Sequence, residues 1–156
     1  MSAHPDVYNN IWELPKEIHE EFSFQAVESV RRPLFTMPVA AGSPIPVDDH
    51  VDSELDLNEL LIEHPAATFF VRVRGESMVE AGIYDGDILI VDSSLEATDG
   101  RIVIVSVDGD LTVKTLRIRD KEVTLEARNK QFLPLKIEPY MEFHIIGVVT
   151  SVIHRL

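Results

Sequence analysis

Six short segments rich in β-branched and aromatic residues fill the chain from residue 67 onward and leave room for almost no helix. Turn-forming residues separate them, and Asp108-Gly109 between two of them is a strong hairpin signal. Strands joined by such short connections predict a mainly β domain with an antiparallel, partly closed, barrel-like sheet. The expected strands are 68–74, 87–92, 101–107, 111–119, 121–128 and 142–153, with Gly147 at a bulge or bend of the last.

The chain before residue 67 has a different character. Residues 1–38 are expected to form an extended arm with one helix over residues 16–22, because Pro15 suits the first turn of a helix. Residues 38–50 contain three prolines and one glycine, which disfavour a helix and favour extended backbone. Extended backbone is the form in which proteases usually bind a peptide.

A second short helix is expected within residues 55–64. Asp56 is a suitable N-cap residue, with Glu59 three positions further on, and Pro65 ends the helical pattern. The sequence therefore predicts a linker with one short helix between the arm and the β domain.

The balance of charge argues against direct binding to nucleic acid. The chain carries 14 Lys+Arg against 27 Asp+Glu, a net charge of −13, and residues 1–70 alone hold 3 against 13. Nucleic-acid affinity rests mainly on cations that neutralise phosphates, so any link to DNA is expected to run through a protein partner. An acidic surface that simply keeps the protein soluble explains many of these carboxylates equally well.

Length and residue types narrow the class further. The 156 residues fit one domain with an extension, and the absence of cysteine excludes disulfides and thiolate metal sites. We find no signal-peptide pattern and no apolar run of membrane-spanning length, which favours a cytoplasmic protein with no membrane contact. The six histidines are scattered, Asp85-Gly86-Asp87 fits a turn, and no phosphate or dinucleotide motif is present, so neither metal nor cofactor is expected.

One serine and one lysine are candidates for catalysis. Ser77 follows a strand and Gly75, which permits a sharp turn that presents the hydroxyl and nearby backbone N–H groups. Strand alternation places Lys114 on one face with Thr112, Leu116 and Ile118. Mostly apolar surroundings disfavour the charged amine and lower its pKa, as a general base near neutral pH requires.

The residues alone leave other interpretations open. Lys114 also fits a solvated edge-strand lysine, and Ser77 fits a turn serine that caps the next segment. Ala41-Gly42, flanked by prolines, has the small residues that let a backbone approach a nucleophile, but it also fits an ordinary flexible tether.

A resemblance to a known family decides between these interpretations. The stretches Gly75-Glu-Ser77-Met78, Asp85-Gly-Asp-Ile-Leu-Ile-Val-Asp92 and Thr112-Val-Lys114 resemble the catalytic domain of the LexA/UmuD family of self-cleaving serine peptidases. The segment Asp56 to Pro65 and the stretch Ile146-Gly-Val-Val are also similar to that family, most closely to its UmuD branch. The resemblance covers roughly residues 36–156.

The resemblance implies a role for each of these residues. Ser77 would be the nucleophile, Lys114 the general base, and the backbone N–H groups of Ser77 and Met78 the donors to the oxyanion. Ala41-Gly42 would be the bond that is cut. The chain would then divide into an arm that is removed, a linker with a short helix, and a peptidase and dimerisation domain, over residues 1–41, 42–66 and 67–156.

The same resemblance implies partners. Members of this family are cut when a RecA–single-stranded-DNA filament stimulates them, and the UmuD-type product forms a homodimer that joins a UmuC-type polymerase in error-prone translesion synthesis. The arm is longer than that of UmuD, and Ala-Gly is the LexA form of the cut site. Two alternatives therefore stay open: a LexA-like regulator without a DNA-binding domain, and a non-catalytic dimeric binding module.

Overall fold

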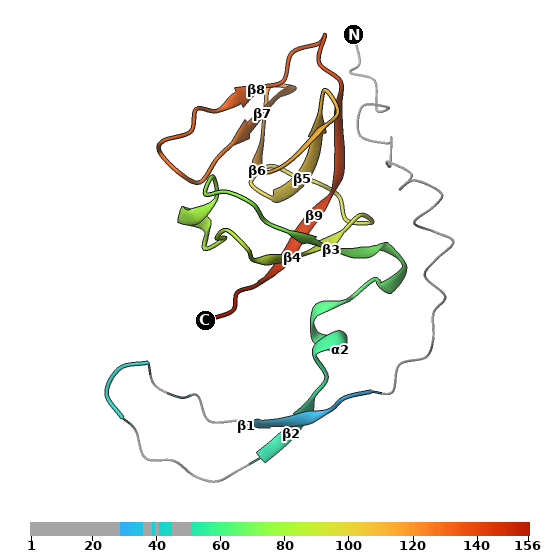
Figure 1. The fold of residues 1–156 in the computed structure, drawn as a ribbon. Coiled ribbons are helices and arrows are strands. Elements are labelled where there is room, and N and C mark those ends of the chain that lie inside the picture. Colours follow the sequence, from blue (N-terminus) through green and yellow to red (C-terminus); the bar gives the residue numbers. More distant parts are fainter. Residues whose placement is uncertain (1–28, 36–38, 40, 45–50) are drawn as a thin grey trace.

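The computed structural model of the chain describes residues 29–35, 39, 41–44 and 51–156. Most of the described residues form one seven-stranded sheet in which every neighbouring pair of strands is antiparallel, in the order β3-β4-β9-β5-β6-β7-β8 (Figure 1). The strands are β3 (Thr68–Arg72), β4 (Ile88–Asp92), β5 (Ile102–Val107), β6 (Asp110–Arg119), β7 (Glu122–Glu126), β8 (Leu135–Lys136) and β9 (Phe143–Ile153).

The expected mainly β, antiparallel fold is confirmed. Each of the six expected strands matches one observed strand, shortened at one or both ends in most cases, and β8 is an addition of only two residues. The sheet is open, because β3 and β8 are its two edges in the described part of the chain. No helix among the described residues is both long and apolar enough to cross a membrane.

Strand β9 joins the two halves of the sheet. Its second half pairs with β4 from Val148 to Ile153, and its first half pairs with β5 from Phe143 to Val148. The pairing with β5 shifts register between the partners of Ile104 and Val105, next to Gly147, as expected for a bulge or bend there. A Cβ at Gly147 would lie 2.7 Å from Val91 Cγ1, so only glycine allows β4 to approach this closely.

The apolar core has two parts, and alternate residues of β5 contribute to them: Ile104 to the first, Val103 and Val105 to the second. The first part packs around the connection between β3 and β4, and it contains Val73, Met78, Ile83, Leu89, Val91, Ile104 and Ile146. The second part packs beneath β5, β6 and β7, and it contains Val103, Val105, Leu116, Leu125 and Val148. Ile146 and Val148, which flank Gly147 on β9, also belong to different parts of the core.

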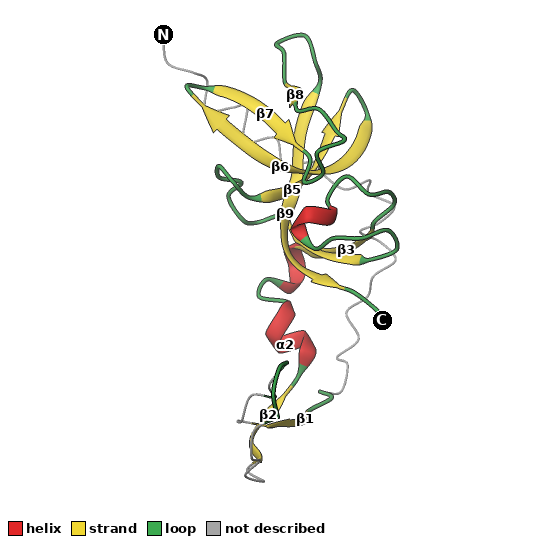
Figure 2. Ribbon diagram, turned by 90° about the vertical axis from the view of Figure 1, so that its left-hand side faces the viewer, coloured by secondary structure: helices red, strands yellow, loops and turns green. Residues whose placement is uncertain are grey.

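A second, two-stranded sheet precedes the domain. Strands β1 (Arg32–Phe35) and β2 (Val51–Leu55) pair antiparallel, and Figures 1 and 2 show this hairpin apart from the large sheet, with helix α2 (Leu57–Leu61) between them. The sequence did not predict these strands, since β1 falls in the expected extended arm and β2 in the expected linker of residues 42–66. The helix expected over residues 16–22 lies outside the described residues.

The expected short helix is confirmed as α2, and its cap has an additional role. The Asp56 carboxylate accepts a hydrogen bond from the Asn58 N–H at 2.8 Å, as an N-cap residue does. The same carboxylate accepts the Ser29 hydroxyl at 2.8 Å and the Val30 N–H at 3.1 Å. These hydrogen bonds lower the pKa of Asp56, the Ser29 bond most of all. Asp56 therefore ties the arm to the linker.

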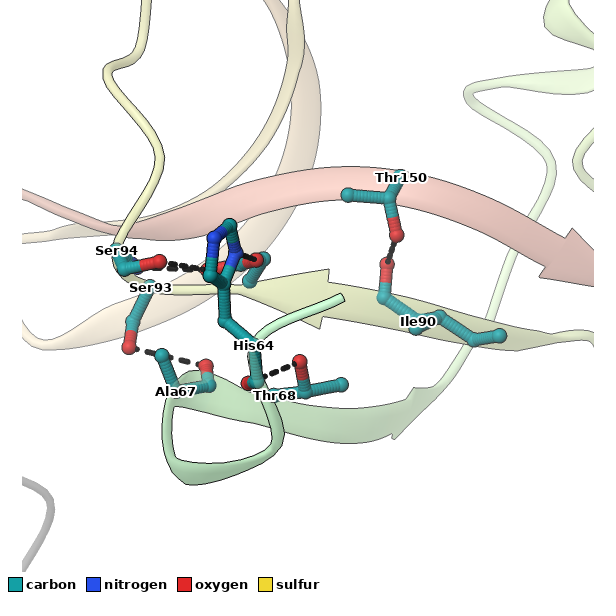
Figure 3. Close-up of polar contacts among 8 residues, drawn as sticks. His64, Ala67, Thr68, Ile90, Ser93, Ser94 and Thr150 are labelled. Atoms are coloured by element: carbon teal, nitrogen blue, oxygen red, sulfur yellow. Dashed lines mark hydrogen bonds and ion pairs between the residues drawn. The ribbon is translucent and has the colours of Figure 1, made fainter. Parts of the chain in front are cut away.

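The linker is fastened to the large sheet at the end of β4 (Figure 3). The buried Asp92 carboxylate lies 2.6 Å from His64 Nδ1 and accepts the Ser94 hydroxyl, also at 2.6 Å. Burial acts to raise the pKa of Asp92, but the hydrogen bonds from Ser94 and His64 outweigh it and hold that pKa below 3.8. The Ser93 hydroxyl donates to the Ala67 carbonyl, which fixes the start of β3 against the end of β4.

Candidate active site

Ser77 lies in the connection between β3 and β4, just before a 3₁₀ helix over Val79–Ala81. Gly75 has a φ of +95°, in the region that favours glycine, so the chain turns sharply two residues before the serine. The Gly75 N–H donates to Asp85 Oδ1 at 2.7 Å, which closes this connection on itself. The Met78 side chain, in contrast, is buried in the core and anchors the loop from below.

The segment that follows β7 holds the serine loop from the other side. The Arg128 N–H donates to the Ser77 carbonyl at 2.8 Å, and the Glu80 N–H donates to the Arg128 carbonyl at 2.8 Å. The Asn129 side-chain amide donates to the Glu76 carbonyl at 2.9 Å. The serine therefore sits on backbone that is held in place from two parts of the chain.

Lys114 reaches this loop from the middle of β6. Its Nζ lies 3.0 Å from Ser77 Oγ, 2.9 Å from Thr112 Oγ1 and 3.1 Å from the Val113 carbonyl oxygen. Thr112 and Lys114 share a face of the strand, as alternation predicts, while Val113 packs on the core. The structure thus brings together a serine and a lysine that lie 37 positions apart in the sequence.

The surroundings of Lys114 favour its uncharged form. The side chain is half-buried, and this burial lowers its pKa from the usual 10.5. An uncharged amine has two N–H groups and one lone pair. The Val113 carbonyl and the Thr112 hydroxyl can accept both N–H groups, which leaves the lone pair to accept the proton of the Ser77 hydroxyl.

Two backbone N–H groups beside the serine are available to a ligand. The N–H groups of Ser77 and Met78 donate to no acceptor within the part of the chain that the structure describes. Free N–H groups next to a nucleophile are the arrangement that stabilises an oxyanion in acyl transfer. The arrangement can therefore supply a nucleophile, a base and oxyanion donors within a few ångströms of one another.

A groove of about 390 Å³ opens beside Ser77. Its walls are mostly apolar side chains from β3, β4, β5, β6 and β9, with Thr112 on one side and Arg72 and Arg74 at the end of β3. The wall on the β3 side belongs to an edge strand, whose outer backbone groups have no partner strand in the described chain. A larger hollow of about 480 Å³, between the β4–β5 loop and β9, contains neither Ser77 nor Lys114.

The structure does not bring Ala41 and Gly42 to this groove. Both residues are exposed in the connection between β1 and β2, and no residue before Phe69 that the structure describes lines the groove. A Cβ added at Gly42 would meet nothing within 4 Å, so this part of the connection is open to solvent. Ser77 and the expected cut site are therefore apart in this conformation.

Sequence reasoning missed several residues that shape the site. Asp85 was interpreted only as part of a turn, and Asn129 was not singled out at all. An Asp-Gly turn gives no indication that its carboxylate closes a loop ten residues earlier, and Asn129 lies 53 positions from its partner Glu76. Thr112 was placed on the face of Lys114, but its contact with the amine was not foreseen.

Comparison with known proteins shows the family of this chain. Residues 33–150 match the family described as Peptidase S24-like. The protein ImpA of Salmonella typhimurium is 44% identical over 129 residues, which are 82% of this chain and 87% of that protein. The protein MucA of Escherichia coli is 39% identical over 135 residues, 86% of this chain and 90% of that protein.

A third relative links the chain to a named repressor. The LexA repressor of Psychromonas ingrahamii is 41% identical over 116 residues, which are 74% of this chain and 55% of that protein. The resemblance to the LexA/UmuD family that the motifs indicated is thereby confirmed. The chain belongs to the peptidase S24-like family of self-cleaving serine peptidases.

Proposed function

We propose that this chain is a UmuD-like protein of the SOS response that cuts itself between Ala41 and Gly42 with a Ser77–Lys114 dyad. The observation that carries the proposal is the 3.0 Å contact between Lys114 Nζ and Ser77 Oγ, made by an amine whose pKa burial lowers. A serine hydroxyl is a weak nucleophile until an adjacent base takes its proton, and an uncharged lysine is such a base.

In the first half of the reaction, Ser77 Oγ attacks the carbonyl carbon of Ala41 while Lys114 Nζ takes the hydroxyl proton. The N–H groups of Ser77 and Met78 stabilise the oxyanion that forms. The bond between Ala41 and Gly42 then breaks as Lys114 gives the proton to the amine of Gly42. The products of this half are a free amine at Gly42 and an ester between Ala41 and Ser77.

In the second half, water releases the ester. Lys114 Nζ takes a proton from the water as the oxygen attacks the Ala41 carbonyl carbon, and the same proton then returns to Ser77 Oγ. The arm leaves with a carboxylate at Ala41, and both members of the dyad regain their starting forms.

The groove supports a peptide substrate of this kind. Residues 38–46 favour extended backbone because of their prolines, and an extended segment can pair with the free edge of β3. The mostly apolar walls suit small apolar side chains, and Val39, Ala40 and Ala41 precede the bond to be cut. Because the substrate belongs to the same chain, a modest catalyst suffices once the segment reaches the groove.

The wider role follows the same proposal. The arm over residues 1–41 is removed, residues 42–66 act as a linker, and residues 67–156 serve as the peptidase and dimerisation domain. A RecA–single-stranded-DNA filament stimulates the cut, and the homodimeric product joins a UmuC-type polymerase as an accessory subunit for translesion synthesis. The protein acts in the cytoplasm without touching DNA itself, in keeping with its net charge of −13.

The test is to incubate the full chain with an activated RecA filament, and separately at alkaline pH, and to measure the masses of the products. We expect fragments 1–41 and 42–156 from the wild type, and neither fragment from Ser77→Ala or Lys114→Ala. Ser93→Ala, which removes a hydroxyl far from the dyad, is the matched control and should be cut normally. The same fragments from either dyad variant would disprove self-cleavage and leave the non-catalytic binding module.

A second candidate is a LexA-like regulator, which the 41% identity to a LexA repressor favours. Residues 1–70 carry 3 Lys+Arg against 13 Asp+Glu, which opposes direct contact with an operator. Specific retardation of an operator fragment by the uncut chain, lost after the cut, would favour the regulator over the polymerase subunit.

A further inference from the structure

Asn129 makes a contact that the proposed reaction does not yet use. It follows β7, and its side-chain Nδ2 donates to the Glu76 carbonyl at 2.9 Å, across 53 positions of sequence. Its Oδ1 accepts the Gln131 N–H at 3.0 Å, which forms a local turn. A carbonyl can only accept and an N–H can only donate, so these two partners together fix which end of the amide faces Glu76.

The Glu76 carbonyl and the Ser77 N–H belong to one peptide unit. That unit is trans, since the described chain contains no cis peptide bond, so the carbonyl and the N–H point in opposite directions. Holding the Glu76 carbonyl toward Asn129 therefore holds the Ser77 N–H away from Asn129. Ser77 lines the groove and Asn129 does not, so an N–H that points away from Asn129 is free to face a peptide in the groove.

The next peptide unit is held in the same way. The Ser77 carbonyl accepts the Arg128 N–H at 2.8 Å, which turns the Met78 N–H away from the segment after β7. Arg128 makes this contact with its backbone, whereas the contact of Asn129 depends on its side chain. The loop also contains Gly75 at a φ of +95°, which gives the backbone before Glu76 freedom to rotate if nothing restrains it.

We propose that Asn129 is a positioning residue for the self-cleavage reaction: its amide donor sets the orientation of the Glu76–Ser77 peptide so that the Ser77 N–H points at the oxyanion. This inference rests on the proposed function. Oxyanion donors accelerate acyl transfer only when they are oriented before the charge develops. Asn129 never touches the substrate, and its whole effect passes through the Ser77 N–H.

Two variants separate this role from the local turn. Asn129→Asp keeps the oxygen that accepts the Gln131 N–H but has no amide donor for the Glu76 carbonyl. Asn129→Ser is uncharged, can accept in the same kind of turn, and is too short to reach Glu76. Ser93→Ala, which also removes one side-chain donor to a distant carbonyl, is the matched control.

The experiment measures the rate of self-cleavage of the full chain from neutral to alkaline pH, together with thermal unfolding. We expect both variants to lower the rate at the alkaline plateau roughly 10- to 100-fold, less than the loss of a complete oxyanion donor. Asn129→Ser should leave the midpoint of the pH profile unchanged, and the unfolding temperature of both variants should stay close to that of the wild type and of Ser93→Ala.

Other outcomes would overturn the inference. A wild-type plateau in both variants would do so, even if the new carboxylate of Asn129→Asp moved the midpoint by raising the pKa of Lys114. A plateau that falls only in proportion to a lowered unfolding temperature would reduce Asn129 to a structural role. If Ser77→Ala is inactive while Asn129→Ser is fully active, this inference fails and the proposed dyad stands. If Ser77→Ala is also cut, the dyad itself fails.

Discussion

Ser77 lies in a loop that hydrogen bonds with Asp85, Arg128 and Asn129 hold in place, whereas Ala41 and Gly42 lie exposed in the connection of a two-stranded hairpin. The first region rests on a buried core, and the described residues of β1 are all exposed. A two-stranded hairpin is at best marginally stable by itself. The proposed catalyst is thus assembled in advance, while its substrate must still be delivered.

This difference indicates where such a reaction can be controlled. In the proposed reaction the Ser77–Lys114 pair keeps its position, whereas the segment that contains Ala41 has to leave its exposed position and enter the groove. A partner can raise the rate by binding the chain more tightly when this segment lies in the groove than when it lies exposed. The increase in rate cannot exceed that ratio of affinities. The comparison therefore predicts that changes at the site in the large sheet strongly alter the rate of self-cleavage. It also predicts that substitutions in the hairpin change the stability of the protein little.

The largest expected effect is the dependence of the cut on pH. Burial lowers the pKa of Lys114, and the fraction of Lys114 that is uncharged grows as pH rises toward that pKa. The rate of self-cleavage should rise roughly tenfold per pH unit while most of the lysine is protonated, and its half-maximal value should come at a lower pH than for an ordinary lysine. Fragment masses followed over time give this profile, and a flat profile would remove Lys114 as the base.

The next effect compares one leucine from each region. Leu116 is fully buried in the core beneath β6, and Leu34 in β1 is 45% exposed. Leu116→Ala should lower the free energy of unfolding by about 2–5 kcal/mol, because it leaves a cavity. Leu34→Ala should change it by less than about 0.5 kcal/mol. Urea unfolding measures both, and equal losses would show that the hairpin is part of the same cooperative unit.

A smaller loss of stability is expected at the join of the sheet. Gly147→Ala adds a Cβ that would lie 2.7 Å from Val91 Cγ1 and 3.1 Å from the Asp92 carbonyl oxygen. We expect a loss of about 1–3 kcal/mol in the free energy of unfolding, typical of overpacking. Gly42→Ala, where a Cβ meets nothing within 4 Å, is the matched control in the exposed region and should be neutral. A neutral Gly147→Ala would mean that β4 can move away from β9 at little cost.

The smallest effect concerns the contact that fastens the linker to the sheet. The hydrogen bond to Asp92 raises the pKa of His64 above 6.5, so the stability it contributes is present below pH 6.5 and is lost as pH rises through the raised pKa. His64→Ala should therefore reduce the unfolding temperature more in mildly acidic than in alkaline buffer. His144→Ala, which removes a histidine whose partner Glu142 is exposed, is the control variant. Equal losses at both pH values would mean that the ion pair contributes nothing.

The sequence predicted those parts of the fold that depend on local pattern. Alternation and turn residues located β3 to β7 and β9, and Asp56 marked the start of α2. Strands β1, β2 and β8 were not predicted because they are short or exposed, so their residues do not show the apolar alternation of a buried strand. In addition, β1 contains Pro33. Their pairing is set by the partner strand rather than by their own composition.

The site was predictable in its residue types but not in its geometry. Ser77, Lys114 and the Ala41-Gly42 segment could be singled out from the motifs. The distances between them depend on which strands pair in the sheet, and the motifs do not show this. Strand β9 lies between β4 and β5 in the sheet, although it is the last strand in the sequence. For the same reason Asn129 could not be found: a single asparagine in a turn has no pattern that points to Glu76.

The position of β9 also bears on how the chain is made. Strands β4 and β5 follow one another in the chain, but they are joined in the sheet only through β9, which ends at Ile153. Nearly the whole chain must therefore be made before the sheet can form across β9, and pairings this distant in sequence form slowly. A nascent chain therefore contains the proposed cut site well before β9 completes the sheet that carries Ser77 and Lys114.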